Sequence, residues 1–173
     1  MKKFGLVAAA DLEWGIGKDG RIPWHFPEDF KWFKKLTMES TCFMGYNTYA
    51  ELALLRDKKK ELLPGRNAVV ISSKAINDKR IQVCRDIEAY EDFATDLNFF
   101  IGGTRIFEFA MDKVHAAYIT RIPLLHDCDT FFPKERLVQH MVLDQIIPLY
   151  NEDGQPTMSV SIFAPKRDLH EDE

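Results

Sequence analysis

The sequence lacks three features that would mark other classes of protein. No apolar run approaches the roughly 18 residues of a membrane span. The three cysteines, Cys42, Cys84 and Cys128, are far apart and form no C-x-x-C pair, so neither a disulfide framework nor a zinc knuckle is expected. There is no basic excess either, because 23 Lys and Arg stand against 27 Asp and Glu, for a net charge of −4. This balance disfavours binding to nucleic acid, and the unpaired cysteines favour the cytoplasm.

The first residues superficially resemble a secretory signal, because Met1-Lys2-Lys3 precedes the apolar run Phe4–Ala10. That run would have to contain the cleavage site itself, and Asp11 follows at once, so the apolar core is too short for a leader. We interpret the run as a first buried strand.

The length of 173 residues, 46% of them apolar, predicts one domain over residues 1–173, with the last few residues disordered. Short apolar runs alternate with helix-period segments, and only strands follow residue 111. This order predicts an α/β fold: a mainly parallel, twisted sheet with an antiparallel C-terminal edge and helices on both faces. Ligands of such sheets bind at the carboxyl ends of the strands. The expected helices are 27–37, 47–55, 86–97 and 104–111, and the expected strands are 4–10, 41–44, 68–72, 81–84, 99–101, 117–121, 141–147 and 158–163.

The helix that begins at Pro27 contains a carboxylate on its apolar side. At about 100° per residue, the aromatic and leucine side chains form one arc and the lysines form the other. Asp29 falls within the apolar arc, between Leu36 and Phe33. A helix dipole favours an acid in the first turn, but it favours Glu28 equally and does not explain why Asp29 faces inward. A carboxylate among aromatic residues is costly and should have a raised pKa, so we interpret Asp29 as functional.

Glycines occur in the loop before Asp29 and directly before two of the predicted helices. The loop from Gly15 to Pro23 is glycine-rich and ends at Trp24, whose indole N–H could hold a water or a ligand near Asp29. Gly45-Tyr46-Asn47-Thr48 and Gly102-Gly103-Thr104-Arg105 each follow a strand and open a helix. Backbone N–H groups at such junctions bind phosphate, and two junctions in one domain suggest a dinucleotide. Ser72-Ser73-Lys74 adds hydroxyls and a cation for another phosphate.

Other polar residues suggest a carboxylate clamp and little else. Leu63-Pro64-Gly65-Arg66 is a turn that presents one arginine, the side chain best suited to a bidentate carboxylate contact. The basic segment 56–61 is most simply a solvated surface loop. The residues of the 115–129 segment that could bind metal match no known ligand spacing, so no metal is expected; they are His115, His126, Asp127, Cys128 and Asp129.

Taken together, these motifs resemble those of the dihydrofolate reductase family over nearly the whole chain. The matching motifs occur in the family's order and are Ala8-Ala9-Ala10, Gly15-Ile16-Gly17, Ile22-Pro23-Trp24, the helix start Pro27-Glu28-Asp29-Phe30-Lys31-Trp32-Phe33-Lys34, Met44-Gly45 with Thr48, Leu63-Pro64-Gly65-Arg66, Ser72-Ser73, Ile101-Gly102-Gly103, Tyr118-Ile119-Thr120 and Asp129-Thr130-Phe131-Phe132-Pro133. The resemblance implies the family's fold and the NADPH-dependent reduction of 7,8-dihydrofolate to 5,6,7,8-tetrahydrofolate.

The resemblance also implies a role for each matching residue. Asp29 would bind the pterin 2-amino group and N3, with Thr120 in the same network, and would promote protonation of N5. Trp24 would anchor a water, Ile22 would lie in a mobile loop over the nicotinamide, and Arg66 would bind the α-carboxylate of the glutamate tail. The pocket for folates and antifolate-like molecules would be lined by Val7, Ala8, Phe30, Phe33, Leu52 and Ile101. The cofactor would contact Ala9, Ile16, Gly45, Thr48, Ser72, Ser73, Lys74, Gly102, Gly103, Thr104, Arg105 and Phe107.

The chain departs from the family pattern at three places. After Gly45 the family usually has one or two basic residues for cofactor phosphates, whereas this chain has Tyr46-Asn47, so a preference for NADPH would rest on Lys74 or Arg105. Phe107 stands where a Tyr is common. The segment 53–62 is longer than in many bacterial members.

Two other functions are compatible with parts of the sequence. A pyrimidine reductase of riboflavin synthesis resembles this fold and also uses NADPH, but Asp29 and the Leu-Pro-Gly-Arg turn argue against it. A catalytically silent relative, kept for nucleotide binding or assembly, would not need the inward acid, Trp24 or Arg66. The sequence therefore predicts a cytoplasmic reductase that acts as a monomer.

Overall fold

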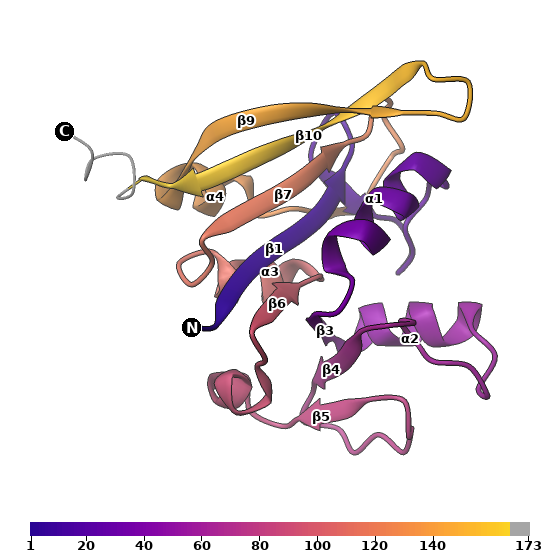
Figure 1. Ribbon diagram of the computed structural model, residues 1–173, viewed down its shortest axis with the longest axis vertical. Coiled ribbons are helices and arrows are strands. Elements are labelled where there is room, and N and C mark those ends of the chain that lie inside the picture. Colours follow the sequence, from indigo (N-terminus) through magenta and orange to yellow (C-terminus); the bar gives the residue numbers. More distant parts are fainter. Residues whose placement is uncertain (167–173) are drawn as a thin grey trace.

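The computed structural model describes residues 1–166, and its main feature is an eight-stranded sheet in the order β5-β4-β3-β6-β1-β7-β10-β9. The strands from β5 to β7 are parallel, and β10 and β9 add an antiparallel edge. Figure 1 shows this order from β5 at the bottom to β9 at the top. The predicted fold class is confirmed. The strands of the sheet are β1 (Lys3–Ala10), β3 (Thr41–Gly45), β4 (Asn67–Ile71), β5 (Gln82–Cys84), β6 (Leu97–Phe100), β7 (Ala116–Arg121), β9 (Met141–Tyr150) and β10 (Pro156–Pro165).

Side chains alternate between two buried faces along the central strands. In β3, Phe43 packs on one face, whereas Cys42 and Met44 pack on the other. The face of Phe43 is covered by η1 (Ile87–Phe93), α3 (Thr104–Ala110) and α4 (Lys134–His140), and the opposite face by α1 (Pro27–Thr37) and α2 (Tyr46–Leu55). Because the central strands are buried on both faces, their sequences are continuous apolar runs rather than alternating apolar and polar residues.

The structure corrects the prediction that no helix follows residue 111. Helix α4 follows Pro133 and has seven residues, of which only Leu137 is buried. One inward residue gives no 3.6-residue period, so the sequence carries no pattern from which the helix could be recognised. The short sheet of β2 (Gly15–Gly17) and β8 (Thr130–Phe131) was likewise not predicted, because strands this short show no alternation.

The structure also shortens the helix expected over residues 86–97. Its place is taken by η1, a 3-10 helix over Ile87–Phe93, and β6 begins at Leu97. The Asp86 side chain accepts a hydrogen bond from the Glu88 N–H and starts the turn. The Asn98 side chain ends the segment, because it accepts from the Thr95 N–H and donates to the Thr95 carbonyl. These local bonds satisfy the backbone without a longer helix.

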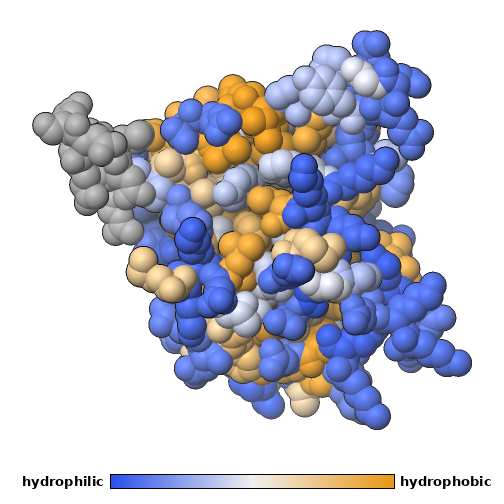
Figure 2. Space-filling view, in the orientation of Figure 1, coloured by the Kyte–Doolittle hydropathy of each residue, from blue (hydrophilic) through white to orange (hydrophobic). Residues whose placement is uncertain are grey.

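The parallel strands end at one edge of the sheet, and the loops after them form the site described below. The hydrophilic loop 56–61 lies at the far end of α2 and is exposed, as expected (Figure 2). Among residues 1–166, no helix is long and apolar enough to cross a bilayer.

The packing of β3 predicts a large stability effect. Phe43 is fully buried, with its ring 5.3 Å from Phe100 and 6.2 Å from Tyr90. Phe43→Ala should lower the free energy of unfolding by about 3–5 kcal/mol, because it removes apolar contacts and leaves a cavity. Urea unfolding followed by circular dichroism would measure this loss. Leu54→Ala, at an exposed position of α2, is the matched control and should change stability by less than about 0.5 kcal/mol.

Candidate active site

A cleft of about 710 Å³ opens where the parallel strands end. Its walls come from the segments that follow β1, β3, β4, β5 and β6, together with the loop around Ile22. The structure brings every residue of the predicted cofactor set to this cleft: Ala9, Ile16, Gly45, Thr48, Ser72, Ser73, Lys74, Gly102, Gly103, Thr104, Arg105 and Phe107. Ile22, Ala8 and Ile101 line it as well.

The middle of the cleft is formed by backbone at two glycine junctions. The Gly45 N–H donates a 2.8 Å hydrogen bond to the Gly102 carbonyl, which ties the ends of β3 and β6 together. Gly102 has φ +122°, and a Cβ there would lie 3.1 Å from the Phe107 ring, so only glycine fits. A Cβ on Gly103 would meet nothing within 4 Å, so this backbone faces open space. Neither α2 nor α3 has a side-chain N-cap, which leaves backbone N–H donors for an anionic ligand.

Asp29 is the most unusual side chain of the neighbouring region, between α1 and the sheet. It is only 8% exposed, whereas Phe30 beside it is 41% exposed. Burial raises the pKa of Asp29 to about 6, and this rise is only partly offset by its hydrogen bond with the Thr120 side chain. Thr120 reaches it because Thr120 pairs with Ala9 in the sheet, on the face that α1 covers. A buried acid with a pKa near neutrality can exchange a proton with a ligand.

The other residues of the predicted folate set do not all lie on the face of the sheet that α1 covers, and not all of them are buried. Phe33, Leu52 and Ile101 pack against the hydrophobic cluster that contains Met44. Trp24 is buried in a separate cluster, and the centre of its ring lies 5.1 Å from that of His126. Val7 is also buried. Phe30 is exposed and packs its ring 5.0 Å from His25. Ala8 belongs to the cluster on the opposite face, although it also lines the cleft.

Arg66 is a half-buried cation without an acidic partner among residues 1–166. Its Nη1 donates to the Thr37 hydroxyl at 3.1 Å and its Nε to the Pro64 carbonyl at 3.2 Å. The guanidinium lies 5.7 Å from the centre of the Phe33 ring. Burial lowers the pKa of Arg66, which is the cost of placing a charge there without a counter-ion. A carboxylate ligand would supply that counter-ion.

Several cleft residues escaped the sequence reasoning. Arg85 follows β5 directly, so the rule that selected Ser72 after β4 would also have found it. Glu51 accepts a 2.9 Å hydrogen bond from the Ile22 N–H and so joins α2 to the loop before α1, a contact that no local pattern predicts. The other lining residues were not among the predicted contacts, although Tyr46 and Asn47 belong to a predicted phosphate-binding junction; they are Gly17, Gly20, Arg21, Tyr46, Asn47, Ile71, Asp86, Ile87, Ile106 and Thr130.

The polar residues of the 115–129 segment have structural partners. Asp127 pairs with Lys18 at 3.1 Å, and Asp129 accepts from the Asp19 N–H at 3.0 Å, so both fasten the loop after β2. Within the described part of the chain, no three His, Cys, Asp or Glu residues are grouped so as to hold a metal ion.

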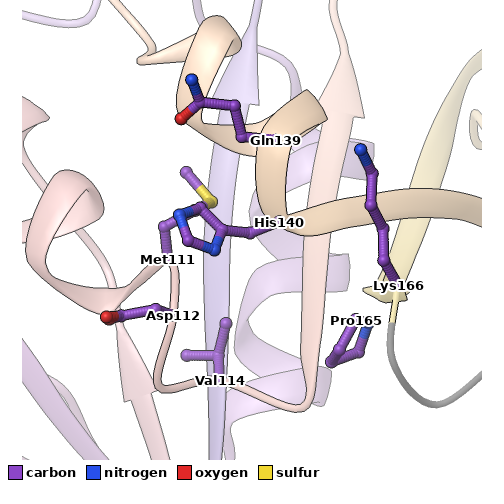
Figure 3. A pocket seen from close by; sticks show the side chains of 7 residues that line it. All are labelled: Met111, Asp112, Val114, Gln139, His140, Pro165 and Lys166. Carbon is purple, nitrogen blue, oxygen red and sulfur yellow. The ribbon is translucent and has the colours of Figure 1, made fainter.

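A smaller cavity of about 250 Å³ lies between α4 and the end of β10, where Figure 3 shows His140 beside Met111. None of the predicted site residues lines it.

Comparison with known proteins identifies the family. A family model for dihydrofolate reductase matches residues 3–159. The chain is 31% identical over 133 residues to the dihydrofolate reductase of Haemophilus influenzae, covering 76% of this chain and 79% of that one. It is 35% identical over 128 residues to that of Staphylococcus aureus, covering 74% and 76%.

Longer relatives and a solved structure agree with this assignment. The chain is 34% identical over 151 residues to a bifunctional dihydrofolate reductase-thymidylate synthase of Arabidopsis thaliana, of which it spans only 26%. The fold matches a dihydrofolate reductase from Enterococcus faecalis, solved with NADP(H) and RAB-propyl, with a TM-score of 0.81 and 25% identity over 95% of this chain and 96% of that one. The chain therefore belongs to the dihydrofolate reductase family and is an NADPH-dependent oxidoreductase.

Proposed function

We propose that this chain reduces 7,8-dihydrofolate to 5,6,7,8-tetrahydrofolate with NADPH, and that Asp29 assists protonation of N5. The observation that carries this proposal is the placement of one buried acid, with a pKa near 6, next to a cleft of dinucleotide size. NADPH supplies the hydride for C6 when it is bound, and the protein must supply a route for the proton. Asp29 is the buried carboxylate available for that task on the face of α1.

The strand order gives the cofactor a direction along the cleft. The nicotinamide would lie near β1, where Ala9 and Ile16 line the cleft, because Asp29 is on that side. The pyrophosphate would lie at the glycine junctions after β3 and β6, and the adenosine would lie beyond β4 and β5. Four strand spacings of about 4.8 Å separate β1 from β5, roughly 19 Å in all, which suits an extended dinucleotide.

The folate would lie between α1 and α2, with its two ends held by opposite charges. The Asp29 carboxylate would accept hydrogen bonds from the pterin 2-amino group and N3, and Thr120 would orient that carboxylate. Phe33, Leu52 and Ile101 would pack against the rings, and Arg66 would bind the α-carboxylate of the tail. Antifolate-like molecules would use the same pocket. We also propose that the enzyme is a monomer and that it acts in the cytoplasm. Its scattered, free cysteines support the second of these proposals.

Asp29→Asn tests the proton route. Oxidation of NADPH by dihydrofolate, followed at 340 nm, should fall by about 10²–10⁴-fold, the range typical of a lost acid. In the wild type, Asp29 is protonated below about pH 6 and ionised above it, so the rate should decline as pH rises through that value. The inflection should be absent from the Asn variant. Near-normal turnover of that variant at pH 7 would show that Asp29 has no catalytic role.

The stability of the same variant provides the control for folding. Because the folded-state pKa of Asp29 lies above its ordinary value of 3.8, folding favours the protonated form, and the free energy of unfolding should fall as pH rises from about 4 to about 6. At pH 7 the buried carboxylate costs roughly 3 kcal/mol, at 1.36 kcal/mol for each pH unit. Asp29→Asn should therefore unfold at an equal or higher temperature than the wild type at pH 7.

Arg66→Leu tests the carboxylate clamp. Folates that carry the glutamate tail should bind about ten- to a hundred-and-fiftyfold more weakly, since a charge-assisted contact contributes about 1.5–3 kcal/mol. Small pterin-like inhibitors lack that carboxylate and should bind within about twofold of the wild type. Calorimetric titration of both ligand types would measure the difference, and equal losses would remove Arg66 from the folate site.

Lys74→Ala tests the contact with the 2′-phosphate that distinguishes NADPH from NADH. The Michaelis constant for NADPH should rise by about tenfold or more, as expected for a charge-assisted contact, while that for NADH stays almost unchanged. Lys79→Ala removes the same charge from an exposed site on the same loop and is the matched control. An equal effect of Lys74→Ala on both cofactors would place the 2′-phosphate elsewhere.

A further inference from the structure

The ring of Tyr46 supports Lys74 in the wall of the cofactor cleft. Tyr46 opens α2, and the Lys74 Nζ lies 4.5 Å from the centre of its ring. Both residues line the cleft, beside Ser72 and Ser73. We propose that Tyr46 is a positioning residue for cofactor specificity: its ring holds the Lys74 ammonium where it meets the 2′-phosphate. This inference rests on the proposed use of NADPH and gives a side-chain role to Tyr46, which the sequence placed only within the Gly45-Tyr46-Asn47-Thr48 junction.

The Tyr46 ring packs against Tyr49, which belongs to a hydrogen-bonded network with Asp78 and Arg80. The Tyr46 and Tyr49 ring centres are 6.0 Å apart, and the Tyr49 hydroxyl donates a 2.7 Å hydrogen bond to Asp78 Oδ2. Arg80 grips the same carboxylate at two points, with Nε–Oδ1 at 2.9 Å and Nη2–Oδ2 at 2.7 Å. The side chains of Asp78 and Arg80 are each only 11% exposed. The network therefore connects α2 to the loop 72–81, which also carries Lys74.

The network leaves the charge of Lys74 available to a ligand. Asp78 is the acid nearest in sequence to Lys74, and Arg80 already neutralises it. Among residues 1–166, Lys74 makes no ion pair. An aromatic face attracts an ammonium without cancelling its charge, whereas a carboxylate would cancel it. The ring also restricts a flexible side chain before the ligand arrives, which lowers the entropy cost of binding.

The position of the pair in the cleft favours the adenosine end of the cofactor. Lys74 follows β4, and Arg85 follows the neighbouring strand β5, so both cations lie at the end of the cleft away from Asp29. The Ser72 and Ser73 hydroxyls add hydrogen-bonding groups at the same place. A phosphate dianion is the part of NADPH that such a group of cations and hydroxyls would recognise.

The test replaces the ring and compares ligands with and without the 2′-phosphate. The variants are Tyr46→Leu, which removes the aromatic face, Tyr46→Phe, which keeps it, and Tyr49→Phe, which removes only the hydrogen bond to Asp78. Calorimetry would measure the affinity of each for adenosine 2′,5′-bisphosphate and for adenosine 5′-monophosphate. Neither probe contains a nicotinamide, and their binding is measured without folate. Tyr46 is 39% exposed, so its replacement should not prevent folding.

We expect Tyr46→Leu to weaken the bisphosphate by about two- to fivefold, the effect of about 0.5–1 kcal/mol for one cation–π contact, and to leave the monophosphate unchanged. Tyr46→Phe should bind both probes as the wild type does, and Tyr49→Phe should give a smaller selective loss. Adding Tyr46→Leu to Lys74→Ala should cause no further loss of selectivity.

The inference would be overturned if Tyr46→Leu caused no selective loss, whether both probes bound as before or weakened equally. The same selective loss in Tyr46→Phe, or additive losses in the double variant, would also overturn it. The proposed function is tested separately by turnover of the wild type with dihydrofolate and NADPH. A wild type that turns over normally while Tyr46→Leu has no selective loss overturns only the inference. A selective loss in a protein that does not reduce dihydrofolate overturns only the proposed function.

Discussion

The hydrogen bond between the Gly45 N–H and the Gly102 carbonyl is the contact on which the site depends, because it joins the ends of two neighbouring parallel strands. It brings the two glycine junctions together and makes the middle of the cleft from backbone. A side chain at Gly102 would meet the Phe107 ring and would also have to adopt φ +122°. The parallel order of the other strands then places an acid on one side of this point and cations on the other.

The distribution of charge follows from that geometry rather than from composition. The chain has a net charge of −4, yet Lys74, Arg85 and Arg105 line one cleft, and Arg66 lies apart from them between α1 and the sheet. A few cations placed at strand ends can meet anionic groups without making the whole surface basic. Burial raises the pKa of Asp29 and lowers that of Arg66, and neither side chain has an oppositely charged partner among residues 1–166.

The sequence predicted the elements that have strong periodicity and missed those held by single contacts. Helix α1 begins and ends where its apolar arc predicts, from Pro27 to Thr37. The strands differ from prediction by at most two residues at either end, except that β9 continues three residues beyond the predicted 141–147. Helix α4 has one buried residue and so left no pattern. The helix predicted over residues 86–97 is longer than the observed η1. The Asn98 side chain bonds to the Thr95 backbone and ends this segment, and such a contact leaves no helical period in the sequence.

The site divides in the same way. The sequence alone determined that Asp29 faces inward, because a helical period relates it to residues within its own two turns. It also determined that glycines and hydroxyls follow the strands that form the cleft. No local pattern indicated that Thr120 would meet Asp29, which only the family resemblance implied. Only the tertiary structure decided that Glu51 would reach the Ile22 N–H and that Lys74 would lie on Tyr46. Those contacts join segments that are distant in the chain, and their distances are set by the pairing of parallel strands and the packing of helices on them, which no local repeat encodes.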